Sequence, residues 1–417
     1  MLSPSALLDV LLMPSFVLAL GAWASVSLLL LLKGLSGGRR AIALAQARQA
    51  VDHIRRRELE PGAENSAIVA LVATLPDSVL LPLGASGAPD APQTRRLAEA
   101  IVARIGRRQL EALAVASAHP RHNARRIAAM ELLTRAESPG VTRLLARTVD
   151  DRDQEIVGAS LAMLGRVPDD IAAAALVDAL KETKYTPSRI ATYLDRFERP
   201  LGESLRPLLH HPDPNVRYWG ATLLSRHPIA GIDSDLAALS RDPAPLVRKA
   251  AVASLAHLGG SRLEQVATAL LADDAWFVRA HAARALATTG DADHAEVIAP
   301  LLTDREWWVR LAAKESLQQL GDEVWAVLVP YLDHEDGFAR NGAAEVLQNI
   351  GVLDSLIVLE AATSRPSAAK LEMLRKIASA GGTRMTAAML ERVDDRARPR
   401  VRALLETLGL EPAGVQS

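Results

Sequence analysis

Apolar positions between residues 240 and 350 recur at the spacing of an amphipathic helix. In the best example they stand at i, i+3, i+4, i+7, i+8 and i+11, which describes one buried helix stripe. These positions are Val309, Ala312, Ala313, Ser316, Leu317 and Leu320. A shorter apolar run from His294 to Asp304 predicts a first helix before this one. The basic unit is therefore a pair of helices, and no alternating strand pattern occurs in this region.

The helix pair repeats along the chain with a nearly fixed period. One arginine marks the same position in each second helix, at successive spacings of 31, 31, 31 and 30 residues. The marker arginines are Arg217, Arg248, Arg279, Arg310 and Arg340. A period of this size predicts an α-solenoid, with about ten units in all. The phase extends with more drift to Arg402 on one side and to Arg189, Gly158, Arg125 and Arg96 on the other.

Glycine and proline occupy fixed places within the repeat. A glycine follows each second helix, where a left-handed residue commonly ends a helix. These glycines are Gly259, Gly290, Gly321, Gly351 and Gly381. Pro207, Pro300 and Pro330 share one position in three of the first helices. Because proline lacks the N–H that a helix needs, a kink is expected in each of these three helices.

The repeat resembles the HEAT repeat superfamily, in the short bacterial form that is also found in phycobilin lyase-like proteins. The resemblance is carried by a turn aspartate, a Val-Arg pair, an Ala-rich second helix and a closing Leu-Gly. One unit shows all of them in Asp304, Val309, Arg310, Leu320 and Gly321. It covers roughly residues 94–409 and implies an all-α, HEAT-repeat solenoid. It also implies that the five marker arginines form a structural ladder with the turn aspartates, and the fold alone carries no activity.

Residues 1–32 have a different composition. Val10 to Leu32 are 23 residues without a charge. At 1.5 Å per residue they reach about 35 Å, enough for a hydrocarbon core of about 30 Å. A cleavable signal peptide is the alternative, but it needs a basic first region and a shorter apolar core. The sequence therefore predicts an uncleaved transmembrane anchor over residues 1–32.

A basic segment follows the predicted anchor. Seven Lys or Arg residues and one acid, Asp52, lie between Lys33 and Arg57. The positive-inside rule then places the N-terminus outside and the repeats in the cytoplasm. Residues 33–60 are expected to form a juxtamembrane helix that contacts anionic headgroups, or equally a solvated connecting helix. The arginines expected at the membrane surface are Arg39, Arg40, Arg55, Arg56 and Arg57.

Prolines and glycines interrupt the pattern over residues 61–93, where we expect a linker or an irregular cap on the first repeat. Residues 94–417 then form the solenoid. The chain has no cysteine and a formal net charge of -1. Disulfides, thiolate zinc sites and cysteine nucleophiles are thus excluded, and nothing indicates nucleic-acid binding. Because known catalytic motifs also fail, we predict no catalytic residue, no metal and no cofactor, and the sequence leaves a small-molecule ligand open.

Aromatic side chains cluster at one turn of the repeat. Trp276 and Trp307 stand three positions before a marker arginine, whereas Phe277, Trp308 and Phe338 stand two positions before one. Three successive units therefore place large rings at the same turn, where stacking predicts a ridge. A tryptophan at the first of these positions is common in HEAT repeats, where it covers the helix pair. All five are hypothesised to bind a partner, with Trp308 the best candidate because aromatic residues dominate interface energetics.

Two classes of function remain. The leading hypothesis is a noncatalytic scaffold that docks a partner protein at the cytoplasmic face of the bacterial inner membrane. Resemblance to membrane-tethered HEAT proteins implies an accessory subunit of an envelope complex, such as an exopolysaccharide synthase or secretion system built around a membrane glycosyltransferase. The alternative is a HEAT-type enzyme, either a bilin lyase or an alkylpurine DNA glycosylase-like protein. The anchor argues against the first enzyme, and the neutral charge together with the anchor argues against the second.

Overall fold

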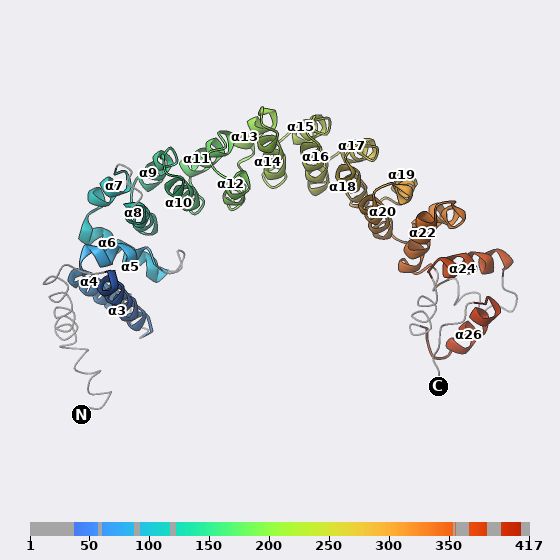
Figure 1. Ribbon diagram of the computed structural model, residues 1–417, viewed down its shortest axis with the longest axis horizontal. Coiled ribbons are helices and arrows are strands. Elements are labelled where there is room, and N and C mark those ends of the chain that lie inside the picture. Colours follow the sequence, from blue (N-terminus) through green and yellow to red (C-terminus); the bar gives the residue numbers. More distant parts are fainter. Residues whose placement is uncertain are drawn as a thin grey trace, which may run out of the picture. The chain divides into compact units, whose positions relative to one another are not determined.

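The chain is all-helical over the residues that the computed structural model describes. Those residues are 37–56, 61–86, 92–116, 122–352, 355, 367–381 and 393–409. They divide into two compact units, Met1–Ser204 and Leu205–Ser417. In each unit the helices follow one another in chain order (Figure 1).

The N-terminal region that was expected to contact a membrane lies partly outside the described residues. All of the predicted anchor, residues 1–32, is outside them. Within the described part, no helix is both long and apolar enough to cross a bilayer. The basic segment forms α3 (Gly37–Arg56). Four of the five arginines expected at the membrane surface lie on α3 and Arg57 lies beyond it, and the side chains of all five are outside the described part.

Two helices occupy the segment that was expected to be a linker or an irregular cap. They are α4 (Pro61–Thr74) and α5 (Asp77–Gly84). Although Pro82 lies inside α5, the helix persists because it buries Val79, Leu80, Leu81 and Leu83. α4 packs on α6 (Pro92–Ile105), and α5 packs on α8 (Asn123–Arg135). The prolines therefore limit the length of these helices without preventing them.

The other helices of the first unit continue the paired arrangement. α7 packs on α8, α9 on α10, and α11 on α12. The bounds are α7 (Arg107–Ala114), α9 (Val141–Thr148), α10 (Gln154–Leu164), α11 (Asp170–Lys181), α12 (Pro187–Leu194) and α13 (Gly202–Leu205).

The second helices of the repeats form a continuous row in the unit Leu205–Ser417, and each packs on the next (Figure 1). They are α14 (Pro214–Leu224), α16 (Pro245–Leu258), α18 (Trp276–Ala287), α20 (Trp307–Gln319) and α22 (Gly337–Asn349). The predicted stripe on α20 is confirmed, because all six of its residues from Val309 to Leu320 are buried. Small alanine side chains in this stripe allow the neighbouring helices to approach closely. α24 (Ala368–Gly381) and α26 (Arg398–Thr407) follow.

The first helices that contain a proline are interrupted there, whereas the kink expected at each proline stays a prediction. α15 (Ile232–Leu239) and α17 (Leu263–Leu270) contain no proline and are continuous. Each of the three helices with a proline is divided into a short α segment and a 3-10 segment, and the proline is the second residue of the latter. The pairs are α13 with η2 (Arg206–His210), α19 (Ala295–Ile298) with η4 (Ala299–Thr303), and α21 (Trp325–Leu328) with η6 (Val329–Asp333). η3 (Ala292–His294) and η5 (Asp322–Val324) precede the last two.

A positive φ is found at four of the five glycines predicted to follow a second helix, and Gly259 has the predicted left-handed helical conformation. Gly259 ends α16 in the left-handed conformation, with φ of 63° and ψ of 36°. Gly290, Gly321 and Gly351 have positive φ values too. A side chain would be strained in this conformation, which explains glycine at these positions. Gly381 is the last residue of α24.

Candidate partner-binding site

Three of the marker arginines form a ladder between successive repeats. Each gives both prongs of its guanidinium to an aspartate that lies 25 residues later, in the turn of the next repeat. The pairs are Arg217 with Asp242 (2.7 and 2.9 Å), Arg248 with Asp273 (both 2.7 Å), and Arg279 with Asp304 (both 2.8 Å). The remaining nitrogen donates to backbone carbonyls of the arginine's own turn. Each rung therefore fixes one turn and joins it to the next.

The carboxylates of the ladder are held in their charged form. Burial by itself would raise the pKa of Asp273, but hydrogen bonds from Arg248 and from the Ala275 amide outweigh burial and lower the pKa. The same balance lowers the pKa of Asp242 and of Asp304. Each aspartate thus carries a full charge at neutral pH, and it also accepts the backbone N–H two residues ahead.

The ladder stops at Arg310. Its donation to the backbone oxygen of Asp304 is retained, at 3.1 Å. The spacing to the next marker arginine is one residue shorter here, so the position equivalent to Asp304, six residues before Arg340, is His334. The His334 Nδ1 accepts the Asp336 N–H at 3.0 Å, so histidine replaces the aspartate within the turn. An imidazole that uses its Nδ1 in this way cannot offer the two acceptor oxygens of a carboxylate, and Arg310 instead lies over the Phe338 ring, 4.5 Å from its centroid.

Arg340 was also expected in the ladder. It donates to the backbone oxygens of His334 and Glu335 within its own turn, at 2.7 and 2.9 Å. The residue 25 positions later is number 365, which lies outside the described residues. Its link to the next repeat therefore stays a prediction.

The aromatic side chains do form a surface cluster at this turn. Trp276 of one repeat stacks on Trp308 of the next, with ring centroids 6.5 Å apart and planes 24° from parallel. Edge contacts then extend the cluster to Phe277 (5.7 Å) and Trp307 (4.8 Å). Phe338 lies in the same register of the next repeat and contacts Arg310, as described above. Rings from two successive repeats therefore form one line of contacts, and a third repeat adds a ring at the same turn.

Exposure shows which of these rings a partner could reach. Trp307 and Trp308 are 54% and 55% exposed, so exposure does not separate a covering role from a contact role. Phe338 is 64% exposed, Trp276 is also exposed, and Phe277 is half-buried. The four exposed rings are the accessible part of the cluster.

One further residue belongs to this surface, and the sequence interpretation missed it. Leu246 stands two positions before Arg248, in the same register as Trp308, and is 52% exposed. Its signal was the register alone, because a leucine draws no attention in a leucine-rich chain. We call Leu246, Trp276, Trp307, Trp308 and Phe338 the exposed stripe. It spans four successive repeats.

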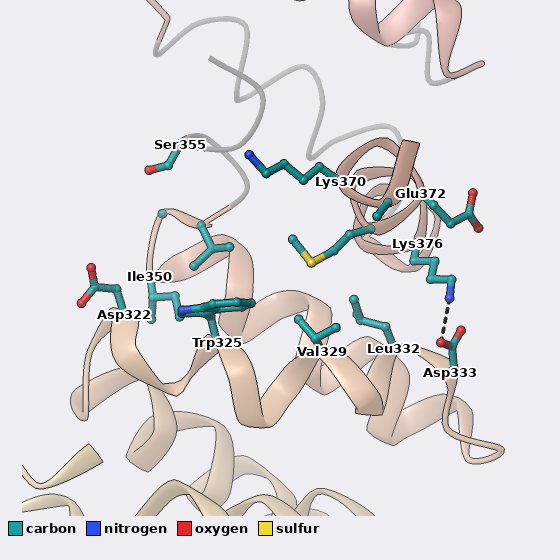
Figure 2. Close-up of a pocket in the computed structure, with 14 residues that line it drawn as sticks. Asp322, Trp325, Val329, Leu332, Asp333, Ile350, Ser355, Lys370, Glu372 and Lys376 are labelled. Atoms are coloured by element: carbon teal, nitrogen blue, oxygen red, sulfur yellow. Dashed lines mark hydrogen bonds and ion pairs between the residues drawn. The ribbon is translucent and has the colours of Figure 1, made fainter. Parts of the chain in front are cut away.

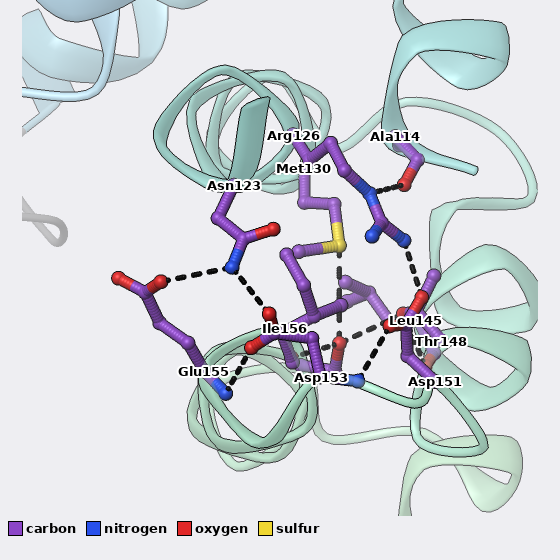
Figure 3. A network of polar contacts seen from close by, with 11 residues as sticks. Ala114, Asn123, Arg126, Met130, Leu145, Thr148, Asp151, Asp153, Glu155 and Ile156 are labelled. Atoms are coloured by element: carbon purple, nitrogen blue, oxygen red, sulfur yellow. Dashed lines mark hydrogen bonds and ion pairs between the residues drawn. The ribbon is translucent and has the colours of Figure 1, made fainter. Parts of the chain in front are cut away.

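The unit Met1–Ser204 contains a different polar cluster, which Figure 3 shows. Arg126 pairs with Asp151, again 25 residues later, and its Nε donates to the backbone oxygen of Ala114 at 3.0 Å. Asn123 donates to Asp153 at 2.7 Å and to Glu155 at 3.1 Å. The marker arginine of this repeat is therefore Arg126, and the expected phase at Arg125 is off by one residue.

A second buried cluster lies nearby in the same unit. Glu131 accepts from Arg135 at 2.6 Å and from Arg166 at 2.9 Å. Burial would raise the pKa of Glu131, but the hydrogen bonds from Arg166 and Arg135 lower it. Arg135 also donates to the Ser86 backbone oxygen at 2.8 Å. These contacts link α8 to the turn that follows α5 and to the turn that follows α10. They do not recur at the repeat spacing, so the periodic pattern of the sequence does not indicate them.

A hollow of about 740 Å³ lies beside Trp325, between η6 and α24 (Figure 2). Its floor is apolar and includes Val329, Leu332 and Met373. A salt bridge of 2.7 Å between Lys376 and Asp333 closes one side. Residues 356–366, which follow the Ser355 that lines it, are outside the described part.

Among the residues that the structure describes, one group of side chains could hold a metal ion. Single ligand atoms of Glu264, Asp291 and His294 lie within 4.8 Å of one another. Glu264 and Asp291 are exposed, and the His294 Nδ1 is 2.9 Å from the Thr289 hydroxyl. Exposed acidic groups commonly lie this close without a metal. We therefore assign this group no role.

Comparison with known families agrees with the geometry. The sequence profile of HEAT repeats matches residues 202–282, 232–318 and 263–348. The three matches advance along the chain by about one helix pair each, over the region that contains the ladder. This chain therefore contains HEAT repeats over residues 202–348, and these repeats form an α-solenoid. No protein with a curated description matches its sequence.

Several solved structures resemble the chain at low identity. An engineered protein is 18% identical, with 93% of this chain and 98% of the other covered and a TM-score of 0.35. Kap121p is 14% identical, with 86% and 45% covered and a TM-score of 0.47. The complex of CpcE and CpcF of phycocyanin lyase from Nostoc sp. PCC7120 is 21% identical, with 64% and 94% covered and a TM-score of 0.26. The chain thus spans less than half of Kap121p, and none of these structures indicates a function.

Proposed function

We propose that this protein is a noncatalytic scaffold that binds a partner protein through the exposed stripe. The observation that supports this most is that five large apolar side chains lie exposed at the same turn of four successive repeats. Exposed apolar patches of this kind mark interaction sites on soluble surfaces. The fold needs none of these rings for its core, which is filled by Val, Ala and Leu.

The chemistry of the stripe favours a protein partner. Tryptophan and arginine are the residue types enriched among interface hot spots, and the stripe combines three tryptophans with Arg310. Stacking of Trp276 on Trp308 limits the rotation of both rings before binding. The two rings therefore lose less side-chain entropy when a partner binds.

Our proposal also includes the location that the sequence predicts. Residues 1–32 would anchor the chain in the bacterial inner membrane, with the N-terminus outside and the repeats in the cytoplasm. The anchor would hold the stripe near membrane proteins and raise their effective concentration, so that modest affinity suffices. The partner is then a membrane protein, such as the glycosyltransferase of an exopolysaccharide synthase or secretion complex, and this protein is an accessory subunit.

The stripe is tested by exchanging its rings for alanine. Trp308→Ala combined with Phe338→Ala should reduce co-purification of the partner from detergent-solubilised membranes at least tenfold, since one hot-spot ring typically contributes 2 kcal/mol or more. Trp325→Ala is the matched control, because Trp325 is a 47% exposed tryptophan outside the stripe. Equal loss in the control, or full recovery in the double variant, would contradict the proposal.

The predicted location has its own test. A reporter that is active only in the cytoplasm, fused after Ser417, should be active. An equivalent periplasmic reporter should be inactive. The opposite pair of results would overturn the topology while leaving the stripe untouched.

A further inference from the structure

Arg310 differs from the other marker arginines in one respect that bears on binding. Its fork faces no carboxylate among the described residues, although Arg217, Arg248 and Arg279 each hold one at 2.7 to 2.9 Å. Contact with the Phe338 ring uses the face of the guanidinium and consumes none of its N–H donors. Arg310 is half-buried and lies beside the exposed stripe.

We propose that Arg310 binds a carboxylate of the partner protein, which takes the place of the absent aspartate in the ladder. This rests on the proposed function of the exposed stripe and names the group that the stripe recognises. The expected partner segment carries an Asp or Glu next to an apolar side chain. The carboxylate meets the Arg310 fork, while the apolar side chain packs on Trp308 and Phe338.

The other three repeats show why a carboxylate is the expected group. At each of them the same backbone position directs an arginine fork onto two carboxylate oxygens, in the two-pronged geometry that suits this pair. The Nη1 of Arg310 still donates to its own turn, so the side chain leaves the turn as the others do. Only the acceptor is missing, because His334 replaces an aspartate.

Charge at the neighbouring turn supports an acceptor from outside the chain. No salt bridge joins Arg310 to Glu335 or Asp336, although both acids lie in the turn that Arg310 faces. Asp336 is used to cap α22 through the Phe338 N–H. The chain thus does not use its own nearby acids to complete this rung within the described residues.

His334→Asp is the most informative variant, because it supplies the missing acid from within the chain. The variant should form a fourth rung with Arg310, raise the melting temperature, and exclude the partner's carboxylate. Arg310→Gln removes the fork by a separate route, so the test does not depend on whether Asp at 334 pairs as expected.

The probe is a phage-displayed library of random dodecapeptides, selected on the purified full-length protein in detergent. We expect the selected peptides to contain an Asp or Glu beside an aromatic or aliphatic residue. Their affinity should fall about tenfold or more in His334→Asp and in Arg310→Gln, as expected for a hydrogen-bonded charge pair. Changing the peptide's acid to its amide should cause a similar loss.

Peptides without an enriched acid, or peptides that bind Arg310→Gln at full affinity, would overturn the inference. A selection that returns no Arg310-dependent peptide would overturn it as well. Acid-free peptides that still lose affinity in Trp308→Ala would leave the stripe as a docking surface and remove only the carboxylate. Acidic peptides that need Arg310 but not Trp308 would instead support this inference and count against the stripe.

Discussion

The two units join their repeats with the same kind of contact but at different regularity. In Leu205–Ser417 an arginine pairs with the next turn's aspartate three times in succession at one spacing. Among the described residues of Met1–Ser204 this contact occurs once, between Arg126 and Asp151. The next marker position, six residues after Asp151, is Val157, so the phase expected at Gly158 is also off by one residue. Val157 is buried and cannot accept or donate, so the row of pairs does not continue. Contacts that do not recur from repeat to repeat, such as those of Glu131 with two arginines, connect the helices here instead.

This difference teaches how a solenoid sequence records its own contacts. A pair that recurs at a fixed spacing restricts two positions in every unit, and the period becomes visible. A pair that occurs once restricts only its own residues. A regular and an irregular unit can therefore share a fold, although only the sequence of the regular unit shows a clear period. The predictions below separate the two modes of stabilisation.

The largest effect is expected in the irregular unit. Glu131→Ala leaves the buried Arg135 and the half-buried Arg166 without their common acceptor. Loss of one partner in a buried ion pair typically costs about 3–5 kcal/mol. Urea unfolding measures this loss of stability, and hydrogen exchange shows whether it is located in α8 and α10. Glu137→Ala is the control, because its pair with Arg95 is exposed and is expected to contribute under about 1 kcal/mol. A loss below that value for Glu131→Ala would contradict a stabilising role.

A smaller loss is expected from one rung of the ladder. Asp273→Asn keeps an oxygen that can accept the Ala275 N–H, but it removes the charge that pairs with Arg248. Because Arg248 keeps its backbone acceptors and is partly exposed, we expect a loss of about 2 kcal/mol. Faster hydrogen exchange should be confined to α16 and α18. If exchange rises equally in all repeats, the rung does not act locally.

The ladder should also make stability depend on pH. The folded pKa of Asp242, Asp273 and Asp304 is lowered. Their contribution is then complete above the unfolded pKa of about 3.9 and is lost as the pH falls through the lowered folded values. Melting temperature should therefore fall between pH 5 and pH 2, and less steeply in Asp273→Asn. An unchanged slope in the variant would assign the acid sensitivity to other groups.

The smallest effect is expected at the exposed stripe. Trp308→Ala with Phe338→Ala should change the free energy of unfolding by under about 1 kcal/mol, since both rings are more than half exposed. Thermal melting monitored by circular dichroism is sufficient. A large fall in melting temperature would place these rings among the packing contacts.

The sequence predicted the repeats of the second unit in detail, because their local signals agree with one another. The buried stripe from Val309 to Leu320, the split helices at proline and the positive φ of Gly259 were all accessible from residue type and spacing. The cluster of rings was accessible as well, since their register is shared. Leu246 was missed because exposure, and not residue type, distinguishes it.

The remaining features depend on what a residue meets across the fold. Arg310 lacks an acidic partner because His334 stands at the equivalent position in the next repeat. The contact of Arg310 with Phe338 could be found only from the structure. The residue Arg126 could not be separated from Arg125, because both are arginines and the period drifts there. The helices α4 and α5 form despite their prolines because the burial of Leu80 and Leu83 outweighs a weak local pattern.

Site-specific photo-crosslinking in living cells tests the central claim most directly. A photoreactive amino acid placed at Trp308 should crosslink this protein to one partner, and one placed at Phe338 should give the same product. The same amino acid at Trp325, which is similarly exposed outside the stripe, should give none. Crosslinks to one partner from Trp325 with none from Trp308 would contradict the account.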